Sequence, residues 1–205
     1  MDNETELLGA LLAGDRQRAG QVALRAFERG GAAHLYEDVV RPALEAVGEL
    51  WRTNQISVAD EHVATALAQT AMASLYPRFP WPAGGPTAIV ACVEGEHHEL
   101  GARMVADLLA LDGWRDVFLG ADTPLDALVA KAVASAPVLV ALSATLPEHR
   151  LAVQQATARL RAVAPDVRLL VGGRAVHPRE AQGLGADYAA GSAREAVDAV
   201  RSWKP

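Results

Sequence analysis

The stretch TAIVACVEGEHHELG, residues 87–101, joins an uninterrupted apolar run to a polar loop and the start of a helix. A short apolar run without alternation is typical of a strand buried on both faces, as in a parallel sheet. Ligands of such sheets bind beyond the carboxyl ends of the strands. The polar segment from Glu94 to Gly101 follows one such end, so this stretch predicts both the type of sheet and the place of a binding site.

Strand-like and helix-like segments alternate from this stretch to the C-terminus. This alternation with short connections predicts a doubly wound, Rossmann-like parallel sheet with helices on both faces. The carboxyl ends of two further strands are expected to bring Ser143 and the pair Gly172-Gly173 to the binding edge. The expected strands are residues 87–93, 116–119, 138–142, 167–171 and 187–190, and the expected helices are 99–112, 124–135, 147–163 and 193–203.

The first eighty residues have the helical period of hydrophobicity and almost no strand signal. The four expected helices lie around residues 7–12, around 22–27, over 34–52 and over 57–76. The fourth begins with a capping box formed by Ser57 and Asp60, and Pro42 is expected to kink the third. Four helices with short connections predict a small bundle.

Four prolines and two glycines in residues 77–86 separate these two halves. Such a composition cannot continue a helix and indicates a linker. We therefore expect a helical-bundle cap domain at 1–80, a linker at 81–86 and an α/β domain at 87–205.

Composition and charge restrict the class of function. Of the 205 residues, 51% are hydrophobic, which is enough for a sizeable core. The net charge is -6 without any run of Lys or Arg, which disfavours direct binding of nucleic acid. The single cysteine, Cys92, excludes an internal disulfide and suits a reducing compartment. Without a membrane-length apolar stretch or a basic signal region, we expect a cytoplasmic protein that does not bind membranes.

Two histidines, His97 and His98, lie among three glutamates in the loop after the first strand. One imidazole nitrogen can bind a metal while the other donates to a carboxylate, which sets the tautomer and raises the basicity of the ligand. The same residues are also typical of a solvated polar loop. Zinc is disfavoured, because the other histidines have no zinc-like spacing to this loop.

Two features at the other strand ends allow two interpretations each. The pair Gly172-Gly173 lets a ligand approach the backbone closely, or is an ordinary tight turn. Ser143 can hydrogen-bond a ligand, or is an ordinary residue at a strand end. The sequence contains neither Gly-x-Gly-x-x-Gly nor a Walker motif, which disfavours a nucleotide cofactor.

Three short elements occur in the order Glu96-x-His98-x-x-Gly101, Ser143-x-Thr145 and Gly172-Gly173. Their order and spacing resemble the cobalamin-binding domain shared by methionine synthase, corrinoid methyl carriers and certain mutases. The pattern of that family is Asp-x-His-x-x-Gly, then Ser-x-Leu, then Gly-Gly. Here Glu96 replaces the usual Asp and keeps the carboxylate, and Thr145 stands where Leu is common.

The resemblance implies a role for the polar loop. His98 would displace the cofactor's own dimethylbenzimidazole base and bind cobalt from below, and Glu96 would hold the far imidazole nitrogen. Gly101 would let the following helix begin close to the corrin, and His97 would also contact the cofactor. In some relatives a hydroxyl residue completes a hydrogen-bond relay to the carboxylate, and the aligned position here is His149.

The resemblance also implies a slot for the nucleotide tail of the cofactor. Ser143 and Thr145 would line this slot, and Gly172 and Gly173 would border it.

The helical half contains Trp51, nine intervening residues, and then Glu61-His62. This spacing matches the Trp-x9-Glu-His signature of cobalamin photoreceptors, which resemble regulators of carotenoid synthesis. The resemblance implies that Trp51 lies over the upper face of adenosylcobalamin, that Glu61 and His62 contact the adenosyl group, and that Val58 lines the same pocket. An indole and polar acceptors suit a nucleoside. The alternative makes Trp51 a residue of the bundle core.

Two features depart from these photoreceptors. Many of them carry a DNA-binding winged helix before the cap, and we expect this protein to lack that domain. Arg52 stands where the carotenoid regulators have a histidine that captures cobalt after illumination. A guanidinium stays protonated, so the usual capture is not expected here.

These resemblances favour a stand-alone cobalamin photoreceptor, a sensor more than an enzyme. Light would cleave the cobalt–carbon bond of adenosylcobalamin and change the helical cap. A protein partner, either a transcription factor or an output enzyme, or a homo-oligomer would respond to that change. The resemblance also allows a bilin in the cap as a second chromophore. The alternatives are a corrinoid methyl-carrier subunit of a methyltransferase system, against which the Trp-x9-Glu-His signature argues, and a cobalamin storage or delivery protein.

Overall fold

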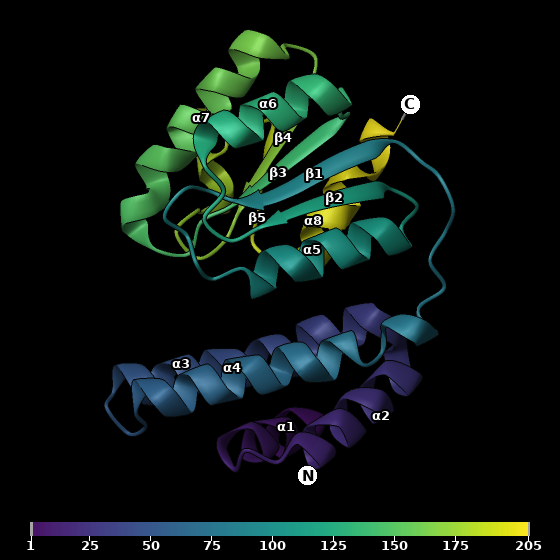
Figure 1. Ribbon diagram of the computed structural model, residues 1–205, viewed down its shortest axis with the longest axis vertical. Coiled ribbons are helices and arrows are strands. Elements are labelled where there is room, and N and C mark those ends of the chain that lie inside the picture. The colour runs from purple at the N-terminus through teal and green to yellow at the C-terminus, as the bar shows by residue number, and fades with distance from the viewer. Residues whose placement is uncertain (1, 205) are drawn as a thin grey trace. The chain divides into compact units, whose positions relative to one another are not determined.

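The computed structural model describes residues 2–204, which form two compact units, one ending at Pro80 and one beginning at Trp81. The described residues of the first unit are helical, and those of the second form a five-stranded sheet between helices (Figure 1). The expected fold class, a helical bundle followed by a doubly wound parallel sheet, is confirmed. None of the helices formed by the described residues is long and apolar enough to cross a membrane.

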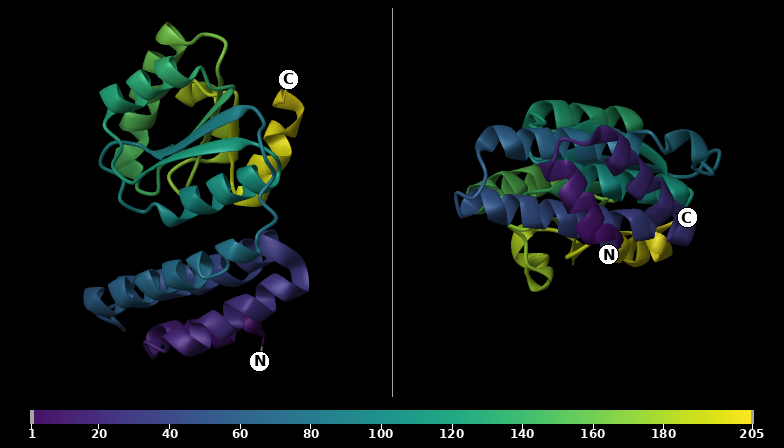
Figure 2. Two further views of the ribbon diagram at one scale, coloured as in Figure 1. Left: turned by 45° about the vertical axis from the view of Figure 1, so that its right-hand side comes forward. Right: turned by 90° about the horizontal axis from the view of Figure 1, so that it is seen from below.

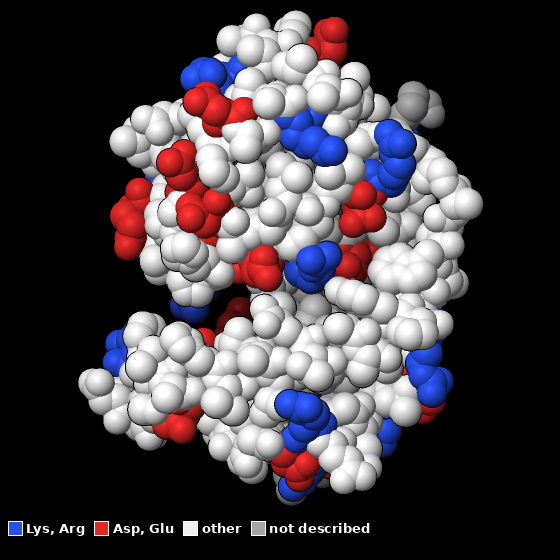
Figure 3. Space-filling view, in the orientation of Figure 1, with Lys and Arg blue, Asp and Glu red and all other residues white. Residues whose placement is uncertain are grey.

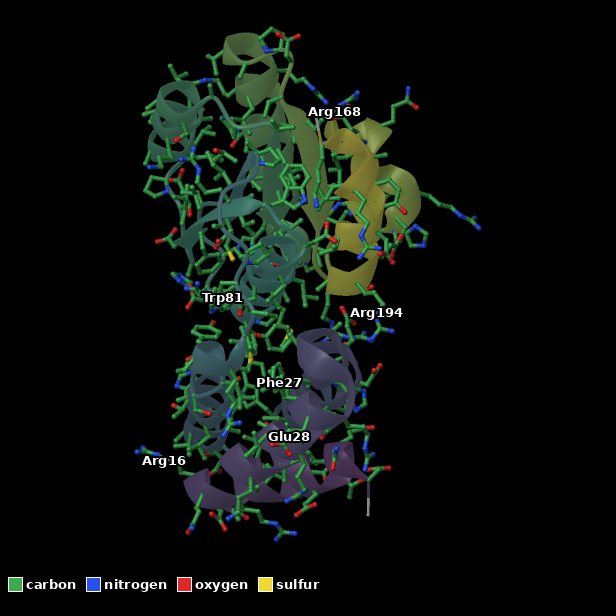
Figure 4. All side chains as sticks on the ribbon, turned by 90° about the vertical axis from the view of Figure 1, so that its right-hand side faces the viewer. Arg16, Phe27, Glu28, Trp81, Arg168 and Arg194 are labelled. Carbon is green, nitrogen blue, oxygen red and sulfur yellow. The ribbon has the colours of Figure 1, made fainter. Side chains whose placement is uncertain are left out.

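The first unit is a bundle of α-helices with a core of its own. The half-buried ring of Phe27 (labelled in Figure 4) stacks on the buried ring of Phe79, with ring centroids 5.2 Å apart. The predicted capping box is confirmed, since Ser57 and Asp60 each accept a hydrogen bond from the other's backbone N–H. The helices are α1 (Asn3–Leu12), α2 (Arg16–His34), the π-helix η1 (Leu35–Val40), α3 (Arg41–Arg52), α4 (Val58–Ala73) and the 3-10 turn η2 (Tyr76–Arg78).

The helix expected over residues 34–52 differs from the prediction. A π-helix comes first, and Pro42 lies in the first turn of α3. Proline has no N–H and its ring collides with the carbonyl four residues earlier in a continuous α-helix. The wider π turn, in which the N–H of Arg41 bonds to the carbonyl of Tyr36, provides the space that proline needs.

The second unit has an entirely parallel sheet in the order β2-β1-β3-β4-β5. Helices α6 and α7 cover one face, and α5 and α8 cover the other (Figures 1 and 2). The elements are β1 (Thr87–Cys92), α5 (Leu100–Leu111), β2 (Arg115–Gly120), α6 (Leu125–Ser135), β3 (Leu139–Ser143), η3 (Pro147–His149), α7 (Arg150–Val163), β4 (Arg168–Gly172), η4 (Pro178–Glu180), η5 (Gln182–Leu184), β5 (Tyr188–Ala190), α8 (Ala193–Val200) and η6 (Arg201–Trp203).

The register of the sheet brings the three sequence elements together. Cys92 at the end of β1 lies opposite Ser143 at the end of β3, and Ser143 lies opposite Gly172 at the end of β4. All six residues of β1 are buried, as its unbroken apolar run predicts. The loops that follow these strands therefore start from one edge of the sheet.

Candidate functional site

The loop that follows β1 lies at the point where the strand order of the sheet reverses. The chain leaves β1 for β2 on one side and returns to β3 on the other. At such a switch point the neighbouring loops diverge, and ligands of parallel sheets bind there. Residues 94–99, which we name the His98 loop, follow β1 at this point.

Glu96 is the buried centre of the His98 loop, with a side chain that is 0% exposed. Its Oε1 accepts hydrogen bonds from the backbone N–H of His98 at 2.8 Å and from its Nδ1 at 2.6 Å. Its Oε2 accepts from the backbone N–H of Thr145 and from the Nδ1 of His149 at 2.9 Å. One carboxylate thus connects two imidazoles and the loop after β3.

These contacts decide the ionisation of Glu96. Burial alone would raise the pKa of this carboxyl, but the hydrogen bonds from the backbone of Thr145 and His98, and from the imidazoles of His149 and His98, outweigh burial and lower its pKa to about 2. Glu96 is therefore a carboxylate at neutral pH and can only accept hydrogen bonds. Both imidazoles must donate through Nδ1.

The Nε2 of a neutral His98 is consequently left with its lone pair. The side chain of His98 is 57% exposed, and no described residue hydrogen-bonds its Nε2. A fixed Nδ1 on a buried carboxylate and a free, exposed Nε2 form the arrangement in which a histidine binds a metal. Across residues 2–204, no group of three or more His, Cys, Asp and Glu side chains is placed to hold a bare metal ion.

Close packing requires glycine at position 173, directly after β4, and leaves little room for a side chain at position 172. Gly173 has φ +95°, and a Cβ at this position would collide with the carbonyl oxygen of Ala144. A Cβ on Gly172 would lie 3.1 Å from the carbonyl oxygen of Ala190. The backbone after β4 therefore lies directly against the loop after β3, as close as only glycine permits.

The other predicted residues of this unit surround the same edge. Ser143 and Thr145 are half-buried. His97 is exposed, and its imidazole has no hydrogen-bond partner among the described residues. Gly101, in the first turn of α5, has no atom within 4 Å of the place that a Cβ would occupy. The fold of the protein itself therefore does not require glycine at position 101.

The predicted residues of the helical unit lie where residues 53–57 connect α3 to α4. The interpretation of Trp51 as a core residue is wrong, because this side chain is 48% exposed, and Val58 is 52% exposed. Glu61 accepts a hydrogen bond from the Oγ1 of Thr65 at 2.8 Å, and its other oxygen lies 3.6 Å from the Nε2 of His62. An exposed indole thus shares this end of the helical unit with a carboxylate and an imidazole.

Arg52 is held by a neighbour on its own helix. Its Nε donates to a carboxylate oxygen of Glu49 at 2.8 Å, and its Nη2 donates to the other oxygen. Both side chains are largely exposed, so the pair contributes little to stability.

Two residues of the site depend on contacts between distant positions; the family resemblance pointed to His149, whereas Asp122 does not stand out in the sequence. The contact of His149 with Glu96 joins positions that are 53 residues apart. Asp122 accepts a hydrogen bond from the backbone N–H of Gly95 at 2.7 Å, and its own N–H donates to the carbonyl of Glu96 at 2.8 Å. The local signal for Asp122 is its position two residues after the end of β2, where aspartate favours turns.

A parallel sheet with an anchored histidine at its switch point defines a ligand-binding α/β domain. Residues 86–201 match the family model described as the B12 binding domain, and residues 4–76 match a second model with the same description. The chain belongs to the B12-binding family, and its cofactor is therefore a cobalamin or another corrinoid.

The similar proteins include two functional classes. The HTH-type transcriptional repressor CarA of Myxococcus xanthus is 38% identical over 143 residues, which are 67% of this chain and 49% of the repressor. Trimethylamine corrinoid protein 1 of Methanosarcina acetivorans is 27% identical over 195 residues, 92% of this chain and 90% of that protein. The chain thus spans about half the length of CarA. The predicted relation to the cobalamin-dependent regulators is confirmed by the matches to the repressors CarA and CarH.

A solved structure supports the fold. The monomethylamine corrinoid protein of Methanosarcina barkeri superposes with a TM-score of 0.82 and 22% identity. The match covers 96% of this chain and 95% of that chain.

Replacing Glu96 by glutamine tests the buried anchor. Both oxygens of Glu96 accept hydrogen bonds from N–H groups. In Glu96→Gln an NH2 group replaces one of these oxygens, so the N–H donors at that position lose their acceptor. We expect the free energy of unfolding to fall by about 1–3 kcal/mol. Urea unfolding followed by circular dichroism measures this change.

The matched control is Glu148→Gln in η3, which makes the same chemical change at an exposed residue outside the relay. Equal stabilities of the two variants would show that Glu96 is not an ionised acceptor.

Proposed function

We propose that this protein is a cobalamin-dependent light sensor that binds adenosylcobalamin with His98 as the lower ligand of cobalt. The observation that carries the proposal is the relay from buried Glu96 to the exposed imidazole of His98, whose free Nε2 suits cobalt. Adenosylcobalamin supplies a cobalt–carbon bond that visible light can break. The residues of the relay fix the orientation of the imidazole and place its donor N–H on Nδ1.

The other strand-end residues fit the same cofactor. The open space at Gly101 supports a close approach by a large planar ligand, which a side chain there would hinder. Ser143 and Thr145 have hydroxyls that can hydrogen-bond a nucleotide tail. Gly172 and Gly173 have no side chains, so only backbone atoms lie beside the loop that contains these hydroxyls. His97, exposed beside His98, is a further contact in this proposal.

The helical unit supplies the residues that suit an adenosyl group. Trp51 is 48% and Val58 is 52% exposed, so an indole ring on which adenine can stack and an apolar side chain are both accessible to a ligand. Glu61 and His62 carry hydrogen-bonding groups that suit ribose and adenine. Removal of the adenosyl group would uncover Trp51, and the helical unit would respond to this loss of a packing partner.

A protein partner or a second copy of the chain would respond to the changed helical unit, and direct binding to DNA is not part of the proposal. On the face shown in Figure 3, Lys and Arg side chains of the described residues are scattered among Asp and Glu. Such a surface does not favour a polyanion. We place the protein in the cytoplasm, because the buried free thiol of Cys92 suits a reducing compartment.

We do not propose a bilin as a second chromophore, since no contact of the described residues favours it.

The competing function is a corrinoid methyl carrier, which the near-complete match to trimethylamine corrinoid protein 1 favours. The Trp-x9-Glu-His signature argues against this alternative, because a methyl group offers no ring on which Trp51 could stack.

Illumination of the reconstituted protein tests the sensor function. Protein loaded with adenosylcobalamin should change its absorption spectrum under green light, and hydrogen exchange in residues 51–62 should become faster as the adenosyl group leaves. The spectrum and the exchange are measured in the dark and after illumination, with methylcobalamin-loaded protein as the control. Identical exchange in light and dark would reject the sensor and favour the methyl carrier.

Trp51→Ala should weaken adenosylcobalamin binding on the order of tenfold, the effect of losing one base–aromatic stack. Binding of hydroxocobalamin, which has no adenine, should change much less. Titration calorimetry with both cofactors measures the difference. The matched control is Trp81→Ala, since Trp81 is also exposed but lies outside the signature (Figure 4). An equal loss for both cofactors would mean that Trp51 serves general packing.

A further inference from the structure

Asp122 has a backbone conformation that its own position in the fold does not explain. Its φ is +44°, in the left-handed region that side chains other than those of Asn and Asp seldom adopt. The other described non-glycine residues with positive φ are Asn54 and Ala136, which follow the ends of α3 and α6, where this conformation is common. Asp122 instead follows strand β2, and its side chain is exposed.

The conformation of Asp122 places two hydrogen bonds on the His98 loop. The carboxylate accepts from the N–H of Gly95 at 2.7 Å, and the N–H donates to the carbonyl of Glu96 at 2.8 Å. These bonds hold the two residues that precede His97 and His98. Strained backbone persists only where the surroundings require it, and here the partners of Asp122 all belong to the His98 loop.

Neighbours of Asp122 hold the same loop at both ends. Glu94 accepts from the N–H of Leu125 at 3.2 Å, and Glu99 accepts from the N–H of Ala121 at 3.0 Å. Residues 121–125 therefore contact the His98 loop both before and after His98. The loop after β3 holds Glu96 from the other side.

We propose that Asp122 is a positioning residue, which orders the His98 loop so that the imidazole of His98 is presented in one orientation. The effect on the cofactor rests on the proposed function, whereas the ordering of the loop does not. Aspartate and asparagine alone combine tolerance of positive φ with a side-chain acceptor for the Gly95 N–H. Glycine would adopt the backbone conformation without the acceptor, and alanine would lack both advantages.

This difference gives a graded set of variants. Asp122→Asn should behave as the wild type, because the amide oxygen replaces the carboxylate oxygen. Asp122→Gly and Asp122→Ala should lose the bond to Gly95. The control is Asp126→Ala in the first turn of α6, which removes a carboxylate whose one ion-pair partner among residues 2–204 is Arg159.

The first measurement is hydrogen exchange of the cofactor-free protein at residues 95–98. The Gly and Ala variants should exchange about tenfold faster at the Gly95 amide, as expected for loss of one hydrogen bond. Asp122→Asn and Asp126→Ala should retain wild-type rates. Wild-type exchange in Asp122→Gly and Asp122→Ala would overturn the proposal, whatever the cofactor does.

The second measurement is the absorption spectrum and affinity of the same proteins with hydroxocobalamin. The Gly and Ala variants should show a smaller fraction with a protein nitrogen as lower ligand, and Asp122→Asn should restore it. A faster-exchanging loop with an unchanged lower ligand would overturn the positioning role. His98→Ala separates the two claims, because a wild-type spectrum in that variant would reject the proposed function, and the exchange data alone would then decide whether Asp122 orders the loop.

Discussion

The carboxylate of Glu96 is the interaction on which the candidate site depends. A buried charge is tolerated only when its hydrogen bonds are satisfied, and Glu96 obtains them from His98, His149 and the backbone of Thr145. The same bonds fix the tautomer of His98 and leave its Nε2 free at the surface. The carboxylate of Glu96 therefore contributes both to the stability of the loop and to its ligand chemistry. Its buried position holds the exposed imidazole of His98 in one tautomer and one orientation.

The arrangement of the rest of the fold serves this group. Parallel pairing aligns Cys92, Ser143 and Gly172 across three strands, so that the loops after β1, β3 and β4 begin together. The close contact between Gly173 and Ala144 keeps the loop after β3 in its place. The N–H of Thr145 belongs to that same loop, so the packing of two glycines is connected, through one short segment, to the ionisation of Glu96.

Much of this could be predicted from the sequence, because periodicity and motif spacing are local signals. The apolar run of residues 87–93 indicated a buried strand, and the spacing from Glu96 to His98 indicated a carboxylate behind an imidazole. The role of Asp122 depends on a contact between distant positions, which no local pattern encodes. His149 was indicated only by the family resemblance, and its contact with Glu96 joins positions 53 residues apart. The π-helix before Pro42 was missed for another reason, since proline predicts a disturbed helix but not how the backbone absorbs it.

The most direct measurement is electron paramagnetic resonance of the protein loaded with cob(II)alamin, with and without 15N-labelled histidine. If the imidazole of His98 is bound to cobalt, the nitrogen hyperfine triplet becomes a doublet on labelling, and the His98→Ala variant loses this change. A triplet that persists in the labelled protein would mean that the nitrogen comes from the cofactor's own base, and would contradict the role of the Glu96–His98 pair.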